Sequence, residues 1–261
     1  MDLDLAGKHA LVCGASEGIG LAAARALAEL GADVTLLARR EDALHAACDA
    51  LPKRDGQRHG FVVADVARTD ALATTAAELA ARKPVHILVN NTGGPPPGPA
   101  HAAVIAAYLD AFTRHLVANQ VLVQALLPGM RAAQWGRIVN VISTSVYEPI
   151  ANLGVSNTIR GAVASWAKTL SKELGADGIT VNNVLPGYTE TSRIAQIVQG
   201  AMARSGKPEH EVRSELAANV PLRRFAQPGE IGAVIAFLCS PAAGYVSGQS
   251  IAVDGGRMQS I

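Results

Sequence analysis

The sequence predicts a single α/β domain built on a doubly wound parallel sheet of about seven strands, with helices on both faces. Short runs rich in Val, Ile and Leu alternate with longer helical stretches along the whole chain. The short runs are almost continuously apolar, as expected for parallel strands that helices cover on both sides. A glycine-rich turn follows the first run and opens a helical stretch, with glycines at Gly14, Gly18 and Gly20.

Each strand is expected where aliphatic and β-branched residues run together between turn signals. In chain order, these strands are residues 9–13, 33–37, 60–64, 87–90, 137–142, 180–184 and 250–253. Helices are expected between them, where alanine, leucine and charged residues recur with a helical period. They are residues 19–30, 41–51, 70–82, 104–130, 154–174 and 228–239. Right-handed crossovers between such strands put ligands at their carboxyl ends, as in a Rossmann-type fold.

Two segments interrupt this alternation. Residues 93–99 read Gly-Gly-Pro-Pro-Pro-Gly-Pro, which excludes a helix or a central strand. Residues 192–220 are polar, amphipathic and partly basic, and they follow a strand end, where a mobile substrate lid is expected; a surface helix pair is the alternative. This segment carries cations that either attract an acidic carrier or substrate, or form a solvated face: Arg193, Arg204, Lys207 and Arg213.

The composition indicates one large buried core and excludes several classes of protein. Of 261 residues, 49% are hydrophobic and 17% charged, so disorder is not expected, and one domain covers residues 1–261. A net charge of +1 favours neither nucleic acid nor an anionic membrane as partner. No basic-then-apolar leader and no bilayer-length apolar run is present, so a cytoplasmic protein is expected. Three dispersed cysteines suit neither a disulfide framework nor a metal site.

The glycine turn predicts a dinucleotide site. Gly14 permits the tight turn, Gly18 lets the backbone approach a diphosphate, and Gly20 allows close packing of helix on strand. The helix that begins there offers free N–H groups and a positive dipole end. Two further residues of the turn are expected to contact the cofactor, namely Ser16 and Ile19.

The end of the second strand favours NADP. The position of Ala38 would carry an acid in an NAD site, whereas Arg39 provides a charge-assisted fork for a 2′-phosphate, with Arg40 beside it. Glu17 argues in the opposite direction, so NAD remains the alternative.

Further motifs resemble the short-chain dehydrogenase/reductase family over essentially the whole chain, most strongly its 3-oxoacyl-acyl-carrier-protein reductase branch. Asp65-Val66 is similar to the pair beside the adenine, and Asn90-Asn91-Thr92-Gly93 to the family's Asn-Asn-Ala-Gly. The segment from Asn183 through Pro186 and Gly187 to Thr191 is similar to the loop at the nicotinamide. The resemblance therefore adds to the expected cofactor site the residues Asp65, Val66, Asn91, Thr92, Gly93, Pro186, Gly187 and Thr191.

The same resemblance exposes a departure at the expected catalytic site. The family carries a Ser, then a Tyr thirteen residues later and a Lys four residues beyond it; here these positions hold Ser143, Ser156 and Arg160. The family's helical Asn corresponds to His115. Ser143 is expected to orient the substrate oxygen, with a strand-end cap as the alternative. Ser156 is a poor acid, and Arg160 keeps the charge that binds ribose but cannot relay a proton.

Substitute acids remain open. His115 either titrates near pH 7 and transfers protons or only bonds the backbone. Tyr147 and Tyr188 are expected as pocket walls, with proton donation as the alternative. The resemblance implies an NADP(H)-dependent oxidoreductase acting on a small carbonyl or alcohol substrate, as a homodimer or homotetramer. The alternatives are a dinucleotide-binding sensor or structural protein without turnover, and a non-redox lyase-type activity.

Overall fold

Seven parallel strands form one sheet in the computed structural model, which describes residues 1–260. Their order across the sheet is β3-β2-β1-β4-β5-β6-β7. The strands are β1 His9–Cys13, β2 Asp33–Ala38, β3 Gly60–Val63, β4 Ile87–Asn90, β5 Gly136–Val141, β6 Ile179–Pro186 and β7 Ser250–Val253. The predicted fold class is therefore confirmed, and every expected strand is present with ends that shift by at most two residues.

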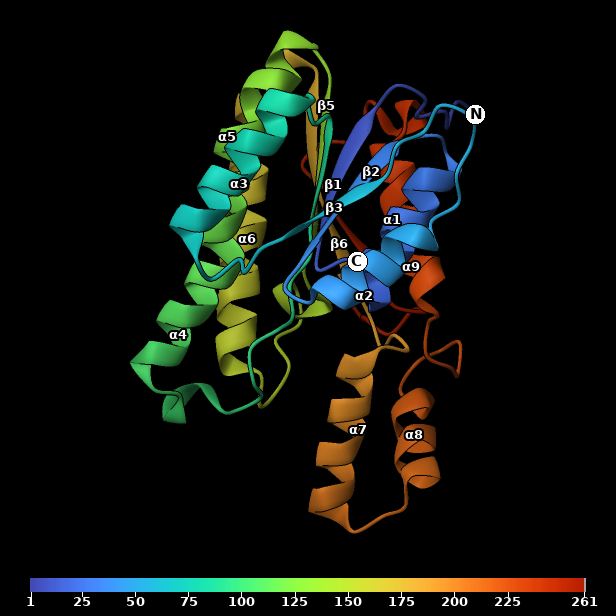
Figure 1. Cartoon of the computed structure of the whole chain (residues 1–261). Coiled ribbons are helices and arrows are strands. Elements are labelled where there is room, and N and C mark those ends of the chain that lie inside the picture. Colours follow the sequence, from blue (N-terminus) through green and yellow to red (C-terminus); the bar gives the residue numbers. More distant parts are fainter. Residues whose placement is uncertain (261) are drawn as a thin grey trace.

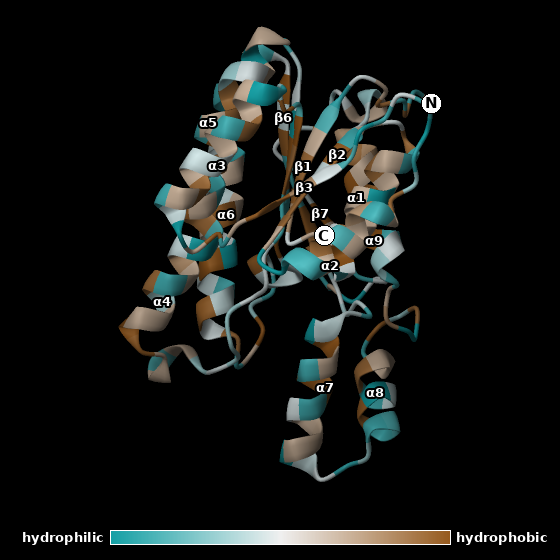
Figure 2. Cartoon of the chain, in the orientation of Figure 1, coloured by the Kyte–Doolittle hydropathy of each residue, from teal (hydrophilic) through white to brown (hydrophobic). Residues whose placement is uncertain are grey.

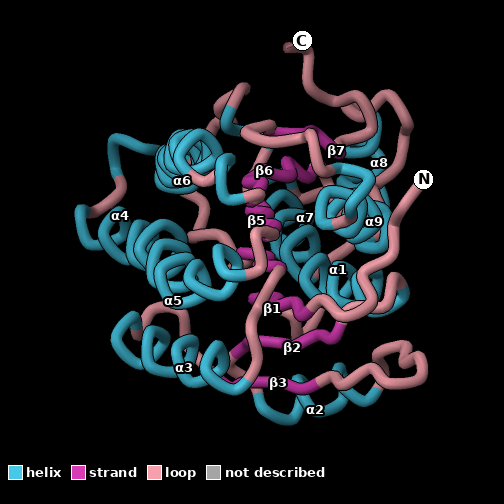
Figure 3. The backbone as a smooth tube through the Cα atoms, turned by 90° about the horizontal axis from the view of Figure 1, so that it is seen from above, coloured by secondary structure: helices cyan, strands magenta, loops and turns pink. Residues whose placement is uncertain are grey.

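Helices cover both faces of this sheet (Figure 1, Figure 3). One layer consists of α1 Gly18–Glu29, α2 Glu41–Asp49 and α9 Pro228–Cys239. The other consists of α3 Thr69–Arg82, α4 Ile105–Phe112, α5 Ala118–Ala132 and α6 Gly154–Glu173. Because a strand's side chains alternate between faces, the central strand β1 serves both layers. Ala10 and Val12 are buried in the core beneath α1 and α9, and Leu11 and Cys13 in the core beneath α3 and α5. Figure 2 shows the resulting apolar strands between two amphipathic layers.

The direction in which successive strands are added to the sheet reverses between β1 and β4. It builds β1, β2 and β3 outward on one side, then returns to place β4 on the other side of β1. Ligands of such sheets bind outside the carboxyl ends of the strands at this reversal. The glycine turn after β1 and the proline-rich loop after β4 both begin there, so the fold brings two predicted site segments together.

The predicted helix 104–130 is wrong in one respect. It runs from Ile105 to Ala132 but contains a π-helical turn at Thr113–Val117 that divides α4 from α5. A π turn inserts an extra residue into the helical ladder and is common at functional sites. Here the turn buries His115, 3% exposed, at the end of the sheet where the site lies.

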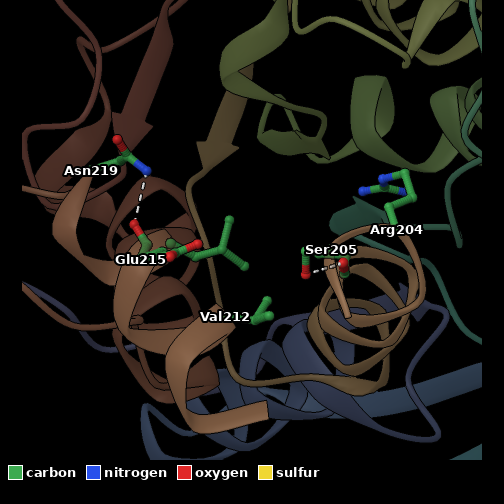
Figure 4. A pocket seen from close by; sticks show the side chains of 7 residues that line it. Arg204, Ser205, Val212, Glu215 and Asn219 are labelled. Carbon is green, nitrogen blue, oxygen red and sulfur yellow. Dashed lines mark hydrogen bonds between the residues drawn. The ribbon is translucent and has the colours of Figure 1, made fainter. Parts of the chain in front are cut away.

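The segment 192–220 forms a helix pair, α7 Ser192–Ser205 and α8 Glu209–Ala218, which projects from the body in Figure 1. It has its own small apolar cluster, built around Ile194, Val198 and Val212. Figure 4 shows a hollow between the two helices, lined by residues that include Arg204 and Glu215. None of the predicted cofactor or catalytic residues lines that hollow, and whether the pair moves as a lid stays a prediction.

Two further findings concern the part of the chain that the structure describes. No helix within residues 1–260 is long and apolar enough to cross a membrane. Nor do three or more His, Cys, Asp or Glu side chains gather there in a way that could hold a metal ion.

Candidate functional site

Gly14 and Gly20 stand where the turn leaves no room for a Cβ. Gly14 and Gly18 have φ of +58° and +60°, a backbone region that favours glycine. A Cβ on Gly14 would lie 2.5 Å from the Asn91 carbonyl oxygen. One on Gly20 would overlap the Gly14 carbonyl oxygen and lie 2.7 Å from Asn91 Nδ2. The glycines therefore let the start of α1, the end of β1 and the end of β4 meet.

The N-terminus of α1 suits an anion. Its N-cap residue, Glu17, makes no side-chain capping hydrogen bond. The first N–H groups of a helix have no partner within the helix, and the helix dipole places partial positive charge there. Gly18, Ile19 and Gly20 form this first turn, so the predicted residues fit the diphosphate of a dinucleotide.

The arginines after β2 differ in their surroundings. Arg40 Nη2 donates to Glu17 Oε2 at 2.6 Å and lies 3.4 Å from Ser16 Oγ. Arg39 is exposed and takes part in none of the ion pairs formed among residues 1–260. Hydrogen bonds from Ser192 and Arg40 lower the pKa of Glu17. Glu17 therefore stays ionised and balances the charge of Arg40.

Asp65 and Val66 follow β3 and are half-buried. The Asp65 carboxylate accepts the Ala67 N–H at 3.0 Å and lies 3.5 Å from Arg114 Nη1. Val66 packs against the core beneath α3 and α5. The pair is thereby fixed at the sheet end next to the β2 arginines.

The loop after β4 links the turn to the helices. The Asn91 amide donates to the carbonyls of Cys13 and Gly14, both at 3.3 Å. Thr92 Oγ1 lies 2.8 Å from His115 Nδ1, and Gly93 follows with an exposed backbone. The predicted Asn91-Thr92-Gly93 segment thus borders both the glycine turn and the π turn.

The loop after β6 reaches the same turn from the other side. The Gly187 N–H donates to the Val253 carbonyl at 3.0 Å, and a Cβ there would lie 2.7 Å from Asp254 Cα. This fixes the chain just after Pro186. Further along, the Thr191 methyl lies 3.3 Å from where a Cβ on Gly18 would stand. The structure therefore brings the predicted residues after β1, β4 and β6 together.

The candidate catalytic residues come from the turn after β5, with Ser143 and Tyr147, and from α6, with Ser156 and Arg160. Ser143 Oγ accepts the Ser145 N–H at 3.1 Å, so it does cap the short turn that follows β5. Tyr147 ends that turn and is 54% exposed. Ser156 and Arg160 are buried one helical turn apart on α6. Tyr188 packs edge-on against Phe225, at 5.6 Å between ring centroids.

The surroundings of His115 favour a neutral ring. Burial, then the charges of Arg160 and Arg114, lower its pKa to about 2. The neutral ring is held between Thr92 and the Gly93 backbone. This favours the expectation that His115 only bonds the backbone, because the neighbouring charges that disfavour an imidazolium come from segments distant in the sequence.

Arg160 is held by backbone oxygens. Its Nη1 donates to the Val141 carbonyl at 2.7 Å, and its Nη2 lies 3.5 Å from the Thr92 carbonyl oxygen. Burial, and secondarily the charge of Arg193, lower its pKa to about 10, so it remains a cation at neutral pH.

Two features of the site escaped the sequence analysis. Ser192 Oγ donates to Glu17 Oε1 at 2.7 Å, which ties the start of α7 to the glycine turn. Arg193, for which the sequence left a solvated face and attraction of an acidic substrate both open, is half-buried and donates to the Pro95 carbonyl at 3.0 Å. The only hint of the Arg193 contact in the sequence was the presence of basic residues in 192–220.

Comparisons with known proteins agree with this arrangement. The family model described as Enoyl-(Acyl carrier protein) reductase matches residues 14–257. The 3-oxoacyl-acyl-carrier-protein reductase of Pseudomonas aeruginosa is 32% identical over 99% of this chain and 100% of its own. Crystal structures of L-sorbose reductase from Gluconobacter frateurii, complexed with NADPH and L-sorbose, and of an actinorhodin polyketide ketoreductase variant with NADPH are also similar. The L-sorbose reductase is 31% identical, and the match covers the whole of both chains with a TM-score of 0.93. The ketoreductase is 31% identical, and the match covers 97% of this chain and 98% of the ketoreductase chain with a TM-score of 0.90.

Proposed function

Because the chain belongs to the short-chain dehydrogenase/reductase family, we propose that it is an NADPH-dependent reductase of a small carbonyl substrate. The observation that carries this proposal is the convergence of the glycine turn, Asn91 and Thr191 at the carboxyl end of the sheet. The NADPH named for the related L-sorbose reductase and polyketide ketoreductase supports the choice of cofactor.

Different residues of the chain have separate roles in such a reduction. The bound cofactor supplies the hydride. Ser143 Oγ accepts a backbone N–H, which leaves its own proton free to donate to a substrate oxygen. Arg160 contributes a fixed positive charge that binds ribose hydroxyls and favours negative charge on that oxygen.

By the resemblance, Ser156 occupies the position of the family's phenol. We propose that Ser156 donates a hydrogen bond to the substrate oxygen but is too weak an acid to protonate it in the rate-limiting step. Tyr147 forms a wall, because more than half of its side chain faces solvent. The alkoxide that hydride transfer leaves is then protonated slowly by solvent water, and the site depends mainly on electrostatic stabilisation.

A panel of carbonyl compounds tests the function. Loss of NADPH absorbance is to be followed with 3-oxoacyl thioesters, diketones, quinones, simple ketones and 2-oxo acids. We expect turnover with at least one class, and NADPH preferred over NADH. Tight NADPH binding with no turnover in any class would contradict the proposal and favour a dinucleotide-binding protein without activity.

Glu17 is expected to weaken NADPH binding. It neutralises Arg40 beside the position proposed for the 2′-phosphate. Because the pair is exposed, E17Q should tighten NADPH binding by about fivefold at low salt and leave NADH nearly unchanged. Fluorescence titration measures both affinities. E29Q, at the far end of α1, changes the net charge equally and should alter neither; equal tightening in both variants would exclude a local effect.

An assembly of two or four copies remains part of the proposal. Apolar side chains of α4 are left exposed, with Ile105 at 73% and Leu109 at 63%. Such a surface on a long helical layer supports contact between copies. The family resemblance points to the same homodimer or homotetramer.

A further inference from the structure

Two arginine side chains approach each other across Gly94, in the loop after β4. A Cβ on Gly94 would stand 3.7 Å from Nη2 of Arg160 and 3.7 Å from Nη2 of Arg193. The two amino groups are therefore at most twice that distance apart. They come from different parts of the chain, since Arg160 lies on α6 and Arg193 on α7.

Neutral backbone carbonyls hold both groups in place. Arg160 uses the carbonyls of Val141 and Thr92, and Arg193 uses that of Pro95. Each guanidinium keeps further N–H donors without a partner among these bonds. Gly94 has no side chain to fill the space between the two guanidinium groups, so the N–H donors of both arginines face the space beside Gly94.

No carboxylate balances the two charges within residues 1–260. The ion pairs of this part of the chain include neither Arg160 nor Arg193. Other cations of the α7–α8 pair do have partners, because Lys207 pairs with Glu215 and Arg213 with Glu190. Keeping two like charges close and partly out of water is costly, and an anion placed between them relieves that cost.

We propose that Arg160 and Arg193 form a subsite for a carboxylate carried by the substrate, so that 2-oxo acids and similar anionic carbonyl compounds are the preferred substrate class. This rests on the proposed reductase function. A planar carboxylate matches the fork of a guanidinium and accepts charge-assisted hydrogen bonds from both. Arg160 lies one helical turn from Ser156, so the bound carboxylate stands beside the carbonyl to be reduced.

The cofactor's diphosphate is the competing anion. The start of α1 already offers it free N–H groups and a helix dipole. Arg193 contacts the loop after β4 and makes no hydrogen bond to residues 14–20. The geometry therefore favours the substrate, and the test below separates the two.

The test measures binding to the protein loaded with NADP⁺, where a carbonyl probe cannot be reduced. Isothermal titration calorimetry compares benzoylformate with methyl benzoylformate, and 2-oxobutanoate with its methyl ester. We expect each acid to bind about tenfold tighter than its ester. R193M should abolish that preference, and R193K, which keeps the charge but loses the fork, should retain only part of it. R204M, which removes an exposed arginine on the same helix, should leave it unchanged.

The outcomes are distinguishable from failure of the proposed function, because this binding needs no turnover. Equal affinity for acid and ester in both pairs would overturn the subsite, even for an active reductase. A loss of NADP⁺ affinity in R193M as large as its loss of acid affinity would assign Arg193 to the diphosphate and also overturn it. Retained acid preference together with an inactive panel would contradict only the reductase.

Discussion

Replacing Gly20 by alanine is expected to weaken NADPH binding by about a hundredfold and to destabilise the fold. The new Cβ would overlap the Gly14 carbonyl oxygen and stand 2.7 Å from Asn91 Nδ2. Backbone cannot give way as a flexible side chain does, so the turn must move. Loss of about two charge-assisted hydrogen bonds to the diphosphate costs roughly 3 kcal/mol, or about a hundredfold in affinity. Overpacking lowers the free energy of unfolding by about 1–3 kcal/mol.

Fluorescence titration of NADPH and denaturant unfolding measure the two effects. Gly229→Ala is the matched control, since a Cβ there meets nothing within 4 Å in helix α9. It should leave NADPH affinity unchanged and stabilise the protein by about 0.5–1 kcal/mol. If Gly20→Ala binds NADPH as tightly as the unaltered protein, the glycine turn is not the diphosphate site.

The glycine turn was predictable because its residues are close in sequence. Gly14, Gly18 and Gly20 follow an apolar run and open a helix, and local chemistry restricts what such a pattern can form. The strand ends were predictable for the same reason. The packing of Asn91 against the turn was not, because nothing local says which loop lies opposite.

The surroundings that the sequence did not reveal all depend on contacts between distant segments. His115 sits in a π turn whose sequence keeps a helical period, and Arg160 lies 45 positions away along the chain. Arg193 is half-buried only because the loop after β4 reaches it. A row of buried amides across the sheet, from Asn90 through Asn140 to Asn183, likewise appears only once the strand register is set.

Introducing Tyr and Lys on α6, at the positions where the family resemblance places that pair, is expected to raise turnover. In the double variant S156Y/R160K, kcat toward a simple ketone should increase by about a hundredfold, because a positioned acid contributes about 10²–10⁴. A phenol is a far better proton donor than an alcohol, and an ammonium one turn away lowers its pKa.

The gain should require the phenol and not merely a smaller cation at position 160. R160K alone should therefore not accelerate turnover, whereas S156Y alone should recover part of the gain. NADPH oxidation gives kcat, and an NADPH affinity close to that of the unaltered protein shows that the cofactor site is intact.

Y147F is the second control: Tyr147 is 54% exposed, and turnover should stay within about twofold if Tyr147 only lines the pocket. Loss of activity in Y147F, with no gain in S156Y/R160K, would instead identify Tyr147 as the proton donor, because a site that already holds a working phenol gains nothing from another.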